Sequence, residues 1–145
     1  MDADVVVVGA GPAGLAVAAR LGRAGIETLV LDRGEAVGDS WRTRYERLHL
    51  HTPRIQSSLP GMSMPARLGR WVTKADMAEY LRLYAIHHGI RPQFRTEVRR
   101  LDPEGNSWTA ITDGGRVSAR QAVVATGYSS VPVRPRWTGE DHLHG

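Results

Sequence analysis

The chain opens with a short β-branched run that ends in a glycine-rich turn. Residues 4–8 read Asp-Val-Val-Val-Val, which is too short for a helix and apolar on both faces, as a central parallel strand must be. Gly9, Gly11 and Gly14 follow directly in a G-x-G-x-x-G pattern. A strand that passes straight into glycines at this spacing predicts a tight strand-to-helix turn.

The residues after this turn complete a βαβ unit. Pro12 suits the first turn of a helix, and residues 13–24 are rich in Ala, Leu and Arg until Gly25 ends the helix. Residues 27–31 then read as a second apolar strand. The unit has the length of about 30 residues that a βαβ unit needs.

Each glycine of the turn has a mechanical role in a dinucleotide-binding unit. Gly9 permits the turn, Gly11 lets the backbone approach a pyrophosphate at the helix N-terminus, and Gly14 allows close packing of helix on strand. Asp32 ends the second strand, where a carboxylate can accept hydrogen bonds from both ribose hydroxyls. The pattern predicts dinucleotide binding, against the alternative of a purely structural glycine turn. It does not separate NAD from FAD, because both carry the same ADP moiety.

The rest of the sequence predicts an irregular segment, a helix and an antiparallel meander. Residues 35–70 lose their periodicity, and so long an irregular stretch is usually functional or disordered. Thr73 and Asp76 form a capping box that opens a helix ending at Gly89. We therefore expect an α/β, Rossmann-like FAD/NAD(P)-binding fold, in which a parallel sheet carries an inserted antiparallel β-meander. Further short strands are expected over residues 90–94, 98–101, 108–112, 116–119 and 121–125.

Composition excludes several classes of function. The 145 residues contain no cysteine, which excludes disulfide frameworks, thiolate metal sites and dithiol redox mechanisms, and with them the flavoprotein disulfide reductases. The net charge is +4, but the basic residues are spread along the chain among acids, so we expect no nucleic-acid partner. No apolar run has membrane length, so we expect no membrane partner and a cytoplasmic location.

Several ordered motifs resemble those of the N-terminal FAD domain of class B flavin monooxygenases. This group covers flavin-containing monooxygenases, Baeyer-Villiger enzymes and auxin-biosynthesis-type enzymes. The resemblance implies an FAD-binding oxidoreductase domain of an NADPH-using monooxygenase that acts on a small-molecule substrate, with the hard chemistry carried by the cofactor. The motifs span essentially the whole chain and lie at residues 9–14, 32–33, 37–42, 48–53 and 125–128.

The resemblance also implies which residues contact the cofactor. The segment Gly38–Arg42 would lie beside the flavin, with Trp41 either packed against the cofactor or serving only as a core or surface aromatic. The backbone of Val98 would meet the adenine, and Thr126 and Gly127 would approach the phosphates. We assign no catalytic residue. The expected cofactor-binding residues are Gly9, Gly11, Pro12, Ala13, Gly14, Asp32, Arg33, Gly38, Trp41, Val98, Ala125, Thr126 and Gly127.

The sequence departs from the family pattern in two places. The family usually has Glu where Asp32 stands, and paired glycines where Gly38 and Asp39 stand, so Asp39 adds a side chain and a charge near the flavin. The chain also carries a single dinucleotide fingerprint. We therefore expect residues 1–145 to form an incomplete FAD-binding domain, without the NADPH domain and the C-terminal return segment, that does not turn over alone.

Two other functions stay open. One is a non-catalytic dinucleotide-binding module, such as a truncated or split flavoprotein half, which would form a homo-oligomer or pair with a second chain that supplies the NADPH domain. The other is an NAD(P)-linked oxidoreductase domain.

Histidines give weaker signals. His49 and His51 alternate without an acid at ligand spacing, so we expect no metal site. His87 and His88 end the second predicted helix, where they can complement its negative C-terminus.

Overall fold

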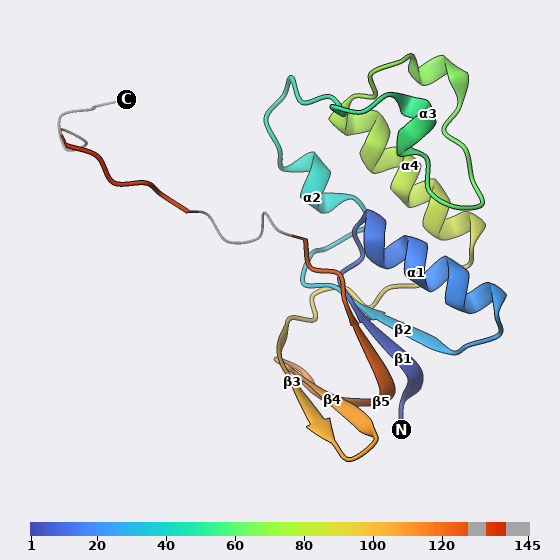
Figure 1. Cartoon of the computed structure of the whole chain (residues 1–145), viewed down its shortest axis with the longest axis vertical. Coiled ribbons are helices and arrows are strands. Elements are labelled where there is room, and N and C mark those ends of the chain that lie inside the picture. The colour runs from blue at the N-terminus through green and yellow to red at the C-terminus, as the bar shows by residue number, and fades with distance from the viewer. Residues whose placement is uncertain (128–132, 139–145) are drawn as a thin grey trace.

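The structure, a computed structural model, describes residues 1–127 and 133–138. Its strands are β1 (Ala3–Val8), β2 (Thr28–Leu31), β3 (Val98–Glu104), β4 (Ser107–Thr112) and β5 (Gly115–Val124). They form one sheet in the order β2-β1-β5-β4-β3 (Figure 1). β1 pairs in parallel with β2 and β5, whereas β4 pairs antiparallel with β5 and β3. The expected α/β fold, a parallel sheet with an antiparallel meander, is confirmed.

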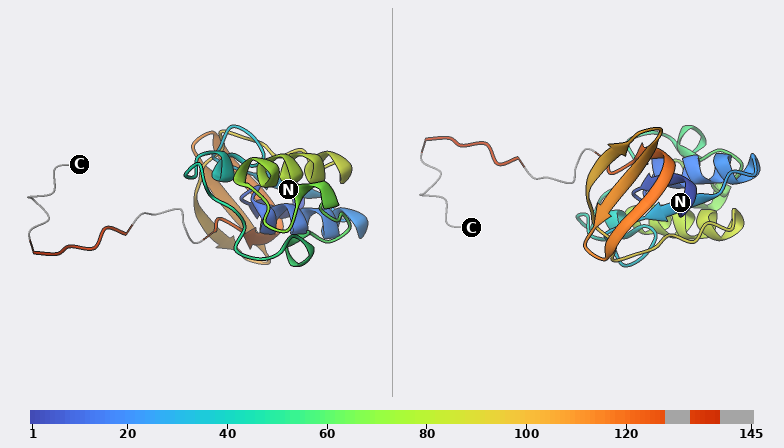
Figure 2. Two further views of the ribbon diagram at one scale, coloured as in Figure 1. Left: turned by 90° about the horizontal axis from the view of Figure 1, so that it is seen from above. Right: turned by 90° about the horizontal axis from the view of Figure 1, so that it is seen from below.

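Helices cover the parallel strands on one side. They are α1 (Pro12–Arg23), α2 (Asp39–Arg42), α3 (Arg54–Ser57), the 3-10 helix η1 (Ala66–Leu68) and α4 (Lys74–His87). α1 packs on β1 and β2, and α4 packs on α1 and α2. Seen from above and below, the helices and the meander lie on opposite sides of β1 (Figure 2).

The alternation of side chains along β1 divides the core in two. Val5 and Val7 face the helices and join a large cluster that includes Leu15 of α1 and Tyr84 of α4. Val6 faces the other way and joins a small cluster with Leu31, Ala110 and Ala119. β1 is therefore buried on both faces, as its uninterrupted valine run predicted.

The structure corrects three expectations about strands. The predicted strands over 116–119 and 121–125 are one continuous strand, β5, whose first half pairs with β4 and whose second half pairs with β1. The predicted strand over 90–94 reduces to a single parallel bridge between Gln93 and Leu31. β3 extends through Pro103 to Glu104, a strand edge where proline's missing N–H is tolerated.

Side chains from other elements organise the 35–70 segment. The hydroxyl of Tyr80 donates to the carbonyl of Met62 (2.6 Å) and accepts from the N–H of Leu59 (2.7 Å). The hydroxyl of Tyr84 donates to the carbonyl of Pro60 (2.7 Å). The alternative of a disordered segment is wrong, because buried tyrosines of α4 fix its backbone.

Thr73 is confirmed as the N-cap of α4, but the reciprocal bond of the capping box runs from its hydroxyl and not from its backbone N–H. The side chain of Thr73 accepts from the N–H of Asp76 (3.1 Å) and donates to the Asp76 carboxylate (2.8 Å). Gly89, with φ of +64°, lies just past the end of the helix. Tyr128, the last residue of the 125–128 motif, lies outside the described residues.

Candidate dinucleotide-binding site

Three loops meet at the carboxyl ends of β1, β2 and β5. The N–H of Gly9 donates to the carbonyl of Leu31 (2.7 Å), and the N–H of Ala125 donates to the carbonyl of Val8 (2.8 Å). The chain leaves β1 toward β2 on one side, while β5 lies on the other. The loops therefore surround the point where the strand order reverses, which is where open α/β sheets bind ligands.

Packing requires two of the three glycines. A Cβ on Gly9 would lie 2.5 Å from the carbonyl oxygen of Ala125, and the φ of Gly9 is +109°. A Cβ on Gly14 would overlap the carbonyl oxygen of Gly9. Gly9 and Gly14 thus bring the helix, the turn and the Ala125–Thr126 backbone into direct contact.

Gly11 differs from the other two. Its φ of −75° is open to any residue, and a Cβ there would meet nothing within 4 Å. Gly11 is the N-cap of α1 and offers no capping side chain, Pro12 is at N1, Ala13 is exposed, and the first turn holds no acid. The first-turn N–H groups of a helix have no partner within it, so this end of α1 presents donors and a partial positive charge beside open space.

Asp32 ties the glycine turn to the loop after β2. Its Oδ2 accepts from the N–H of Ala10 (2.6 Å) and its Oδ1 from the N–H of Gly34 (2.7 Å). The side chain is half-buried. Each carboxylate oxygen has a second lone pair, so both can still accept from a ligand hydroxyl.

The loop after β2 is closed by Asp39. Its Oδ2 accepts from the N–H groups of Glu35 (2.7 Å) and Ala36 (2.8 Å), and its Oδ1 from the Arg42 guanidinium (2.9 Å). Desolvation, the largest single influence, raises the pKa of Asp39, but these donors together hold the pKa below its ordinary value. Gly38 lies against α4 with φ of +87°, where a Cβ would come within 2.9 Å of the Ala78 carbonyl.

The side chains of the remaining predicted site residues lie around these loops. Trp41 is half-buried and packs against the large core cluster that Val5 and Val7 join. Arg33 is exposed, with its guanidinium 4.0 Å from the Glu97 carboxylate. Val98 begins β3 and packs against the small cluster on the other face of the sheet. Thr126 and Gly127 are exposed at the end of β5.

Sequence reasoning missed the links that join these loops. The N–H of Thr96 donates to the Asp32 carbonyl (3.0 Å), and the N–H of Arg95 donates to the Gly34 carbonyl (2.8 Å). The approach to Val98 therefore runs beside the end of β2. Gly34 and Asp39 gave a faint signal, since a glycine and an acid a few residues past Asp32 are typical of a hydrogen-bonded turn.

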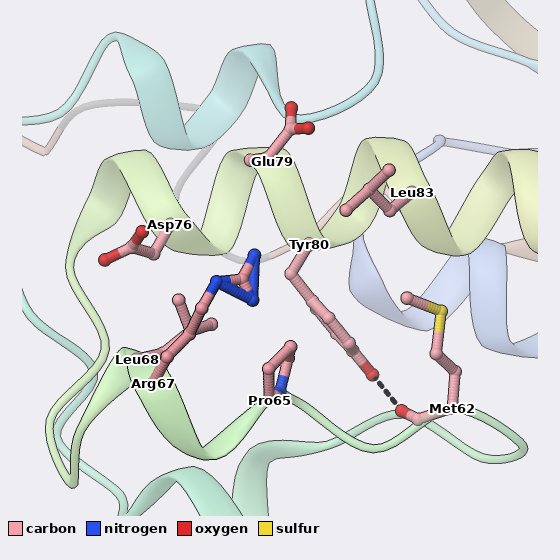
Figure 3. A pocket seen from close by; sticks show the side chains of 8 residues that line it. All are labelled: Met62, Pro65, Arg67, Leu68, Asp76, Glu79, Tyr80 and Leu83. Carbon is pink, nitrogen blue, oxygen red and sulfur yellow. Dashed lines mark hydrogen bonds between the residues drawn. The ribbon is translucent and has the colours of Figure 1, made fainter.

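A shallow pocket lies apart from these loops, between α4 and the loop that carries η1 (Figure 3). Tyr80 forms one wall, and burial raises the pKa of its hydroxyl above the ordinary value despite a hydrogen bond from the Leu59 N–H. The pocket contains no residue of the glycine turn. Its lining residues are Met62, Pro65, Arg67, Leu68, Asp76, Glu79, Tyr80 and Leu83.

The described part of the chain has neither a membrane-spanning helix nor a cluster of metal-binding side chains. No helix there has the length and apolarity to cross a membrane. Within residues 1–127 and 133–138, no three His, Asp or Glu side chains are grouped so as to hold a metal ion.

Known proteins are similar to this chain over nearly its whole length, both in sequence and in structure. The chain is 37% identical over 144 residues to the indole-3-pyruvate monooxygenase YUCCA1 of Oryza sativa subsp. japonica, a match that covers 97% of this chain and 36% of the relative. The flavin-containing monooxygenase from Stenotrophomonas maltophilia has a TM-score of 0.88 and 32% identity, covering 100% of this chain and 44% of that one. An oxidised steroid monooxygenase bound to NADP has a TM-score of 0.79 and 32% identity, covering 97% and 29%.

The chain spans roughly a third of the length of the curated relatives it matches. Residues 6–145 match the family model described as pyridine nucleotide-disulphide oxidoreductase. The 145 residues contain no cysteine, so the disulphide chemistry in that description has no counterpart among them. The chain belongs to the pyridine nucleotide-disulphide oxidoreductase family and is homologous to flavin-dependent monooxygenases.

Proposed function

We propose that residues 1–145 form the FAD-binding domain of a flavin-dependent monooxygenase that uses NADPH and acts on a small-molecule substrate. The ADP half of FAD binds where the glycine turn, Asp32 and the Ala125–Gly127 turn meet. The flavin supplies the redox chemistry when bound, and the residues of this chain bind and orient it. The cytoplasmic location stays a prediction.

Gly11 is the observation that carries this proposal. If the glycines served only the turn, each would be required by packing or by a positive φ, as Gly9 and Gly14 are. Gly11 is required by neither, and the space beside it lies at the uncapped N-terminus of α1. An approaching pyrophosphate explains a glycine at this position, since any side chain would occupy the path to the helix N–H groups.

Each loop has a part in holding the nucleotide. The first-turn N–H groups of α1 donate to the pyrophosphate, and the Asp32 carboxylate accepts from the ribose hydroxyls. Val98 contributes backbone beside the adenine, and Trp41 and Gly38 border the flavin side. Arg33, whose guanidinium lies 4.0 Å from the Glu97 carboxylate, borders the same side as Val98. The name of the similar flavin-containing monooxygenase from Stenotrophomonas maltophilia favours a flavin over a nicotinamide in this site.

The test compares two glycines on the same helix. Gly11→Val should weaken ADP and FAD binding about a hundredfold, the worth of one or two charge-assisted hydrogen bonds. Gly22 also has open space around it, at the other end of α1, so Gly22→Val is the matched control and should bind as the wild type does. Titration calorimetry with ADP measures both.

Normal binding by Gly11→Val would reduce the glycine turn to a structural feature and refute the site. The visible spectrum of the purified chain then separates the cofactors. A flavin spectrum supports FAD, whereas a colourless protein that binds NADPH in titration supports the NAD(P)-linked alternative.

A further inference from the structure

Asp39 stands where the family that this sequence resembles usually has glycine, and its carboxylate accepts three hydrogen bonds. Its carboxylate accepts from the backbone N–H groups of Glu35 and Ala36 and from the guanidinium of Arg42. Arg42 in turn donates to the carbonyl of Val37 (2.8 Å). One side chain therefore fixes the backbone of residues 34–39, which we call the 34–39 turn.

Gly34 connects this turn to Asp32. Its N–H donates to Oδ1 of Asp32, and a Cβ on Gly34 would lie 2.9 Å from that oxygen and 3.3 Å from Oδ2 of Asp39. The two carboxylates thus lie close to the same point beside Gly34. A shift of the turn moves the donor that orients Asp32.

The outer side of the turn is anchored as well. Gly38 packs against Ala78 of α4, and the carbonyl of Gly34 accepts from the N–H of Arg95 (2.8 Å). The lowered pKa keeps Asp39 ionised at neutral pH, the form in which it accepts these bonds. The Asp39 carboxylate holds the N–H groups of the two residues that directly follow Gly34, so Asp39 as well as Arg95 holds Gly34 in place.

We propose that Asp39 is a positioning residue of the nucleotide site, which acts through Gly34 to hold Asp32 in the orientation that binds the ribose diol of a nucleoside diphosphate. The inference rests on the proposed function. Asp39 itself does not contact the ligand. Its effect must therefore depend on the ribose hydroxyls and on Asp32.

The experiment measures dissociation constants for ADP and for 2′,3′-dideoxy-ADP by calorimetry on the full chain. Asp39→Ala should weaken ADP binding about tenfold, the net worth of one hydrogen bond to a charged group, and leave dideoxy-ADP binding unchanged. In an Asp32→Ala background, Asp39→Ala should weaken ADP binding no further, since the effects of substitutions at two coupled residues are not additive. Asp39→Asn keeps the shape of the side chain, and the same measurements are made on this variant if Asp39→Ala does not fold.

Asp2 provides the matched control. It also accepts from a backbone N–H, that of Ser118 (2.8 Å), but at the opposite end of the parallel strands. Asp2→Ala should leave both dissociation constants unchanged. Equal losses for ADP and dideoxy-ADP, a loss that persists without Asp32, or no loss at all would each overturn the inference. Failure of the wild-type chain to bind ADP would overturn the proposed function itself.

Discussion

The βαβ unit and the 35–70 segment are built by different means. In β1, α1 and β2 the backbone follows local rules: a valine run, a glycine turn and a proline at N1. In the 35–70 segment the backbone is also held by side chains that are distant in the sequence, such as Tyr80 and Tyr84 of α4. The βαβ unit can therefore be predicted from a sequence pattern. The 35–70 segment also depends on contacts between residues far apart in the chain, and the sequence alone does not show which residues meet.

The largest expected effect lies in the glycine turn. Gly14→Ala places a Cβ on the Gly9 carbonyl oxygen, where only backbone movement can relieve the overlap. We expect a loss of about 3–5 kcal/mol in the free energy of unfolding. Gly22→Ala, in the same helix with open space around it, should instead stabilise by about 0.5–1 kcal/mol. Chemical denaturation measures both, and similar values for the two variants would contradict the packing role of Gly14.

This contrast explains how much the sequence could predict. The strand, the glycines and Asp32 follow local spacing rules, and the structure places them together as expected. The sequence could not show that β5 is continuous, because its two halves pair with different strands and each half reads as a separate short strand. Nor could the sequence show that the Asp39 carboxylate accepts hydrogen bonds from Glu35 and Ala36, since the conformation of this turn also depends on the packing of Gly38 against α4.

The tyrosines of α4 test the second region. Tyr80→Phe removes a hydroxyl with two backbone partners, the Met62 carbonyl and the Leu59 N–H, and should cost about 2 kcal/mol. Tyr84→Phe removes a single bond to Pro60 and should cost about 1 kcal/mol. Tyr45, 64% exposed, is the control, and Tyr45→Phe should change nothing. The reverse order of Tyr80 and Tyr84, measured by urea denaturation, would refute this account of the segment.

Lys74 links the same segment to the start of α4. Its ammonium, on a side chain only 13% exposed, donates to the carbonyls of Arg44 (2.7 Å) and Arg42 (3.3 Å) at the end of α2. Lys74→Met leaves those carbonyls without their charged donor and should cost about 1.5 kcal/mol. Arg82→Met, which breaks a surface ion pair with Glu79, should cost no more than about 0.5 kcal/mol. Equal costs in denaturation would mean that Lys74 acts only as a surface charge.

His88, just past the end of α4, lies beside Gly61 of the 35–70 segment. The sequence indicated that His87 and His88 can complement the negative end of this helix. In the structure the Nε2 of His88 is buried without a hydrogen-bond partner among the described residues, and its ring lies against Tyr84, tilted by 53° with centroids 4.4 Å apart. Desolvation, then the charges of His87 and Arg23, lowers the pKa of His88, which favours the neutral ring in the folded chain. The lowered pKa disfavours the charged ring that the negative end of α4 would attract.

The smallest expected effect is the pH dependence that His88 imposes. Because its pKa is lower in the folded chain than the ordinary value of about 6.5, the unfolded chain binds the proton more readily as pH falls. The stability that His88 contributes is therefore fully present above about pH 6.5 and is lost as pH falls through the folded pKa. His88→Phe keeps an aromatic ring against Tyr84 and Gly61 but cannot titrate. We expect the variant to lose less unfolding free energy than the wild type between pH 7.5 and pH 5.5 (about two pH units across the titration), measured by urea denaturation at each pH. Parallel curves for the two proteins would show that the burial of His88 does not contribute to acid sensitivity, and that packing of its ring on Tyr84 is its whole effect.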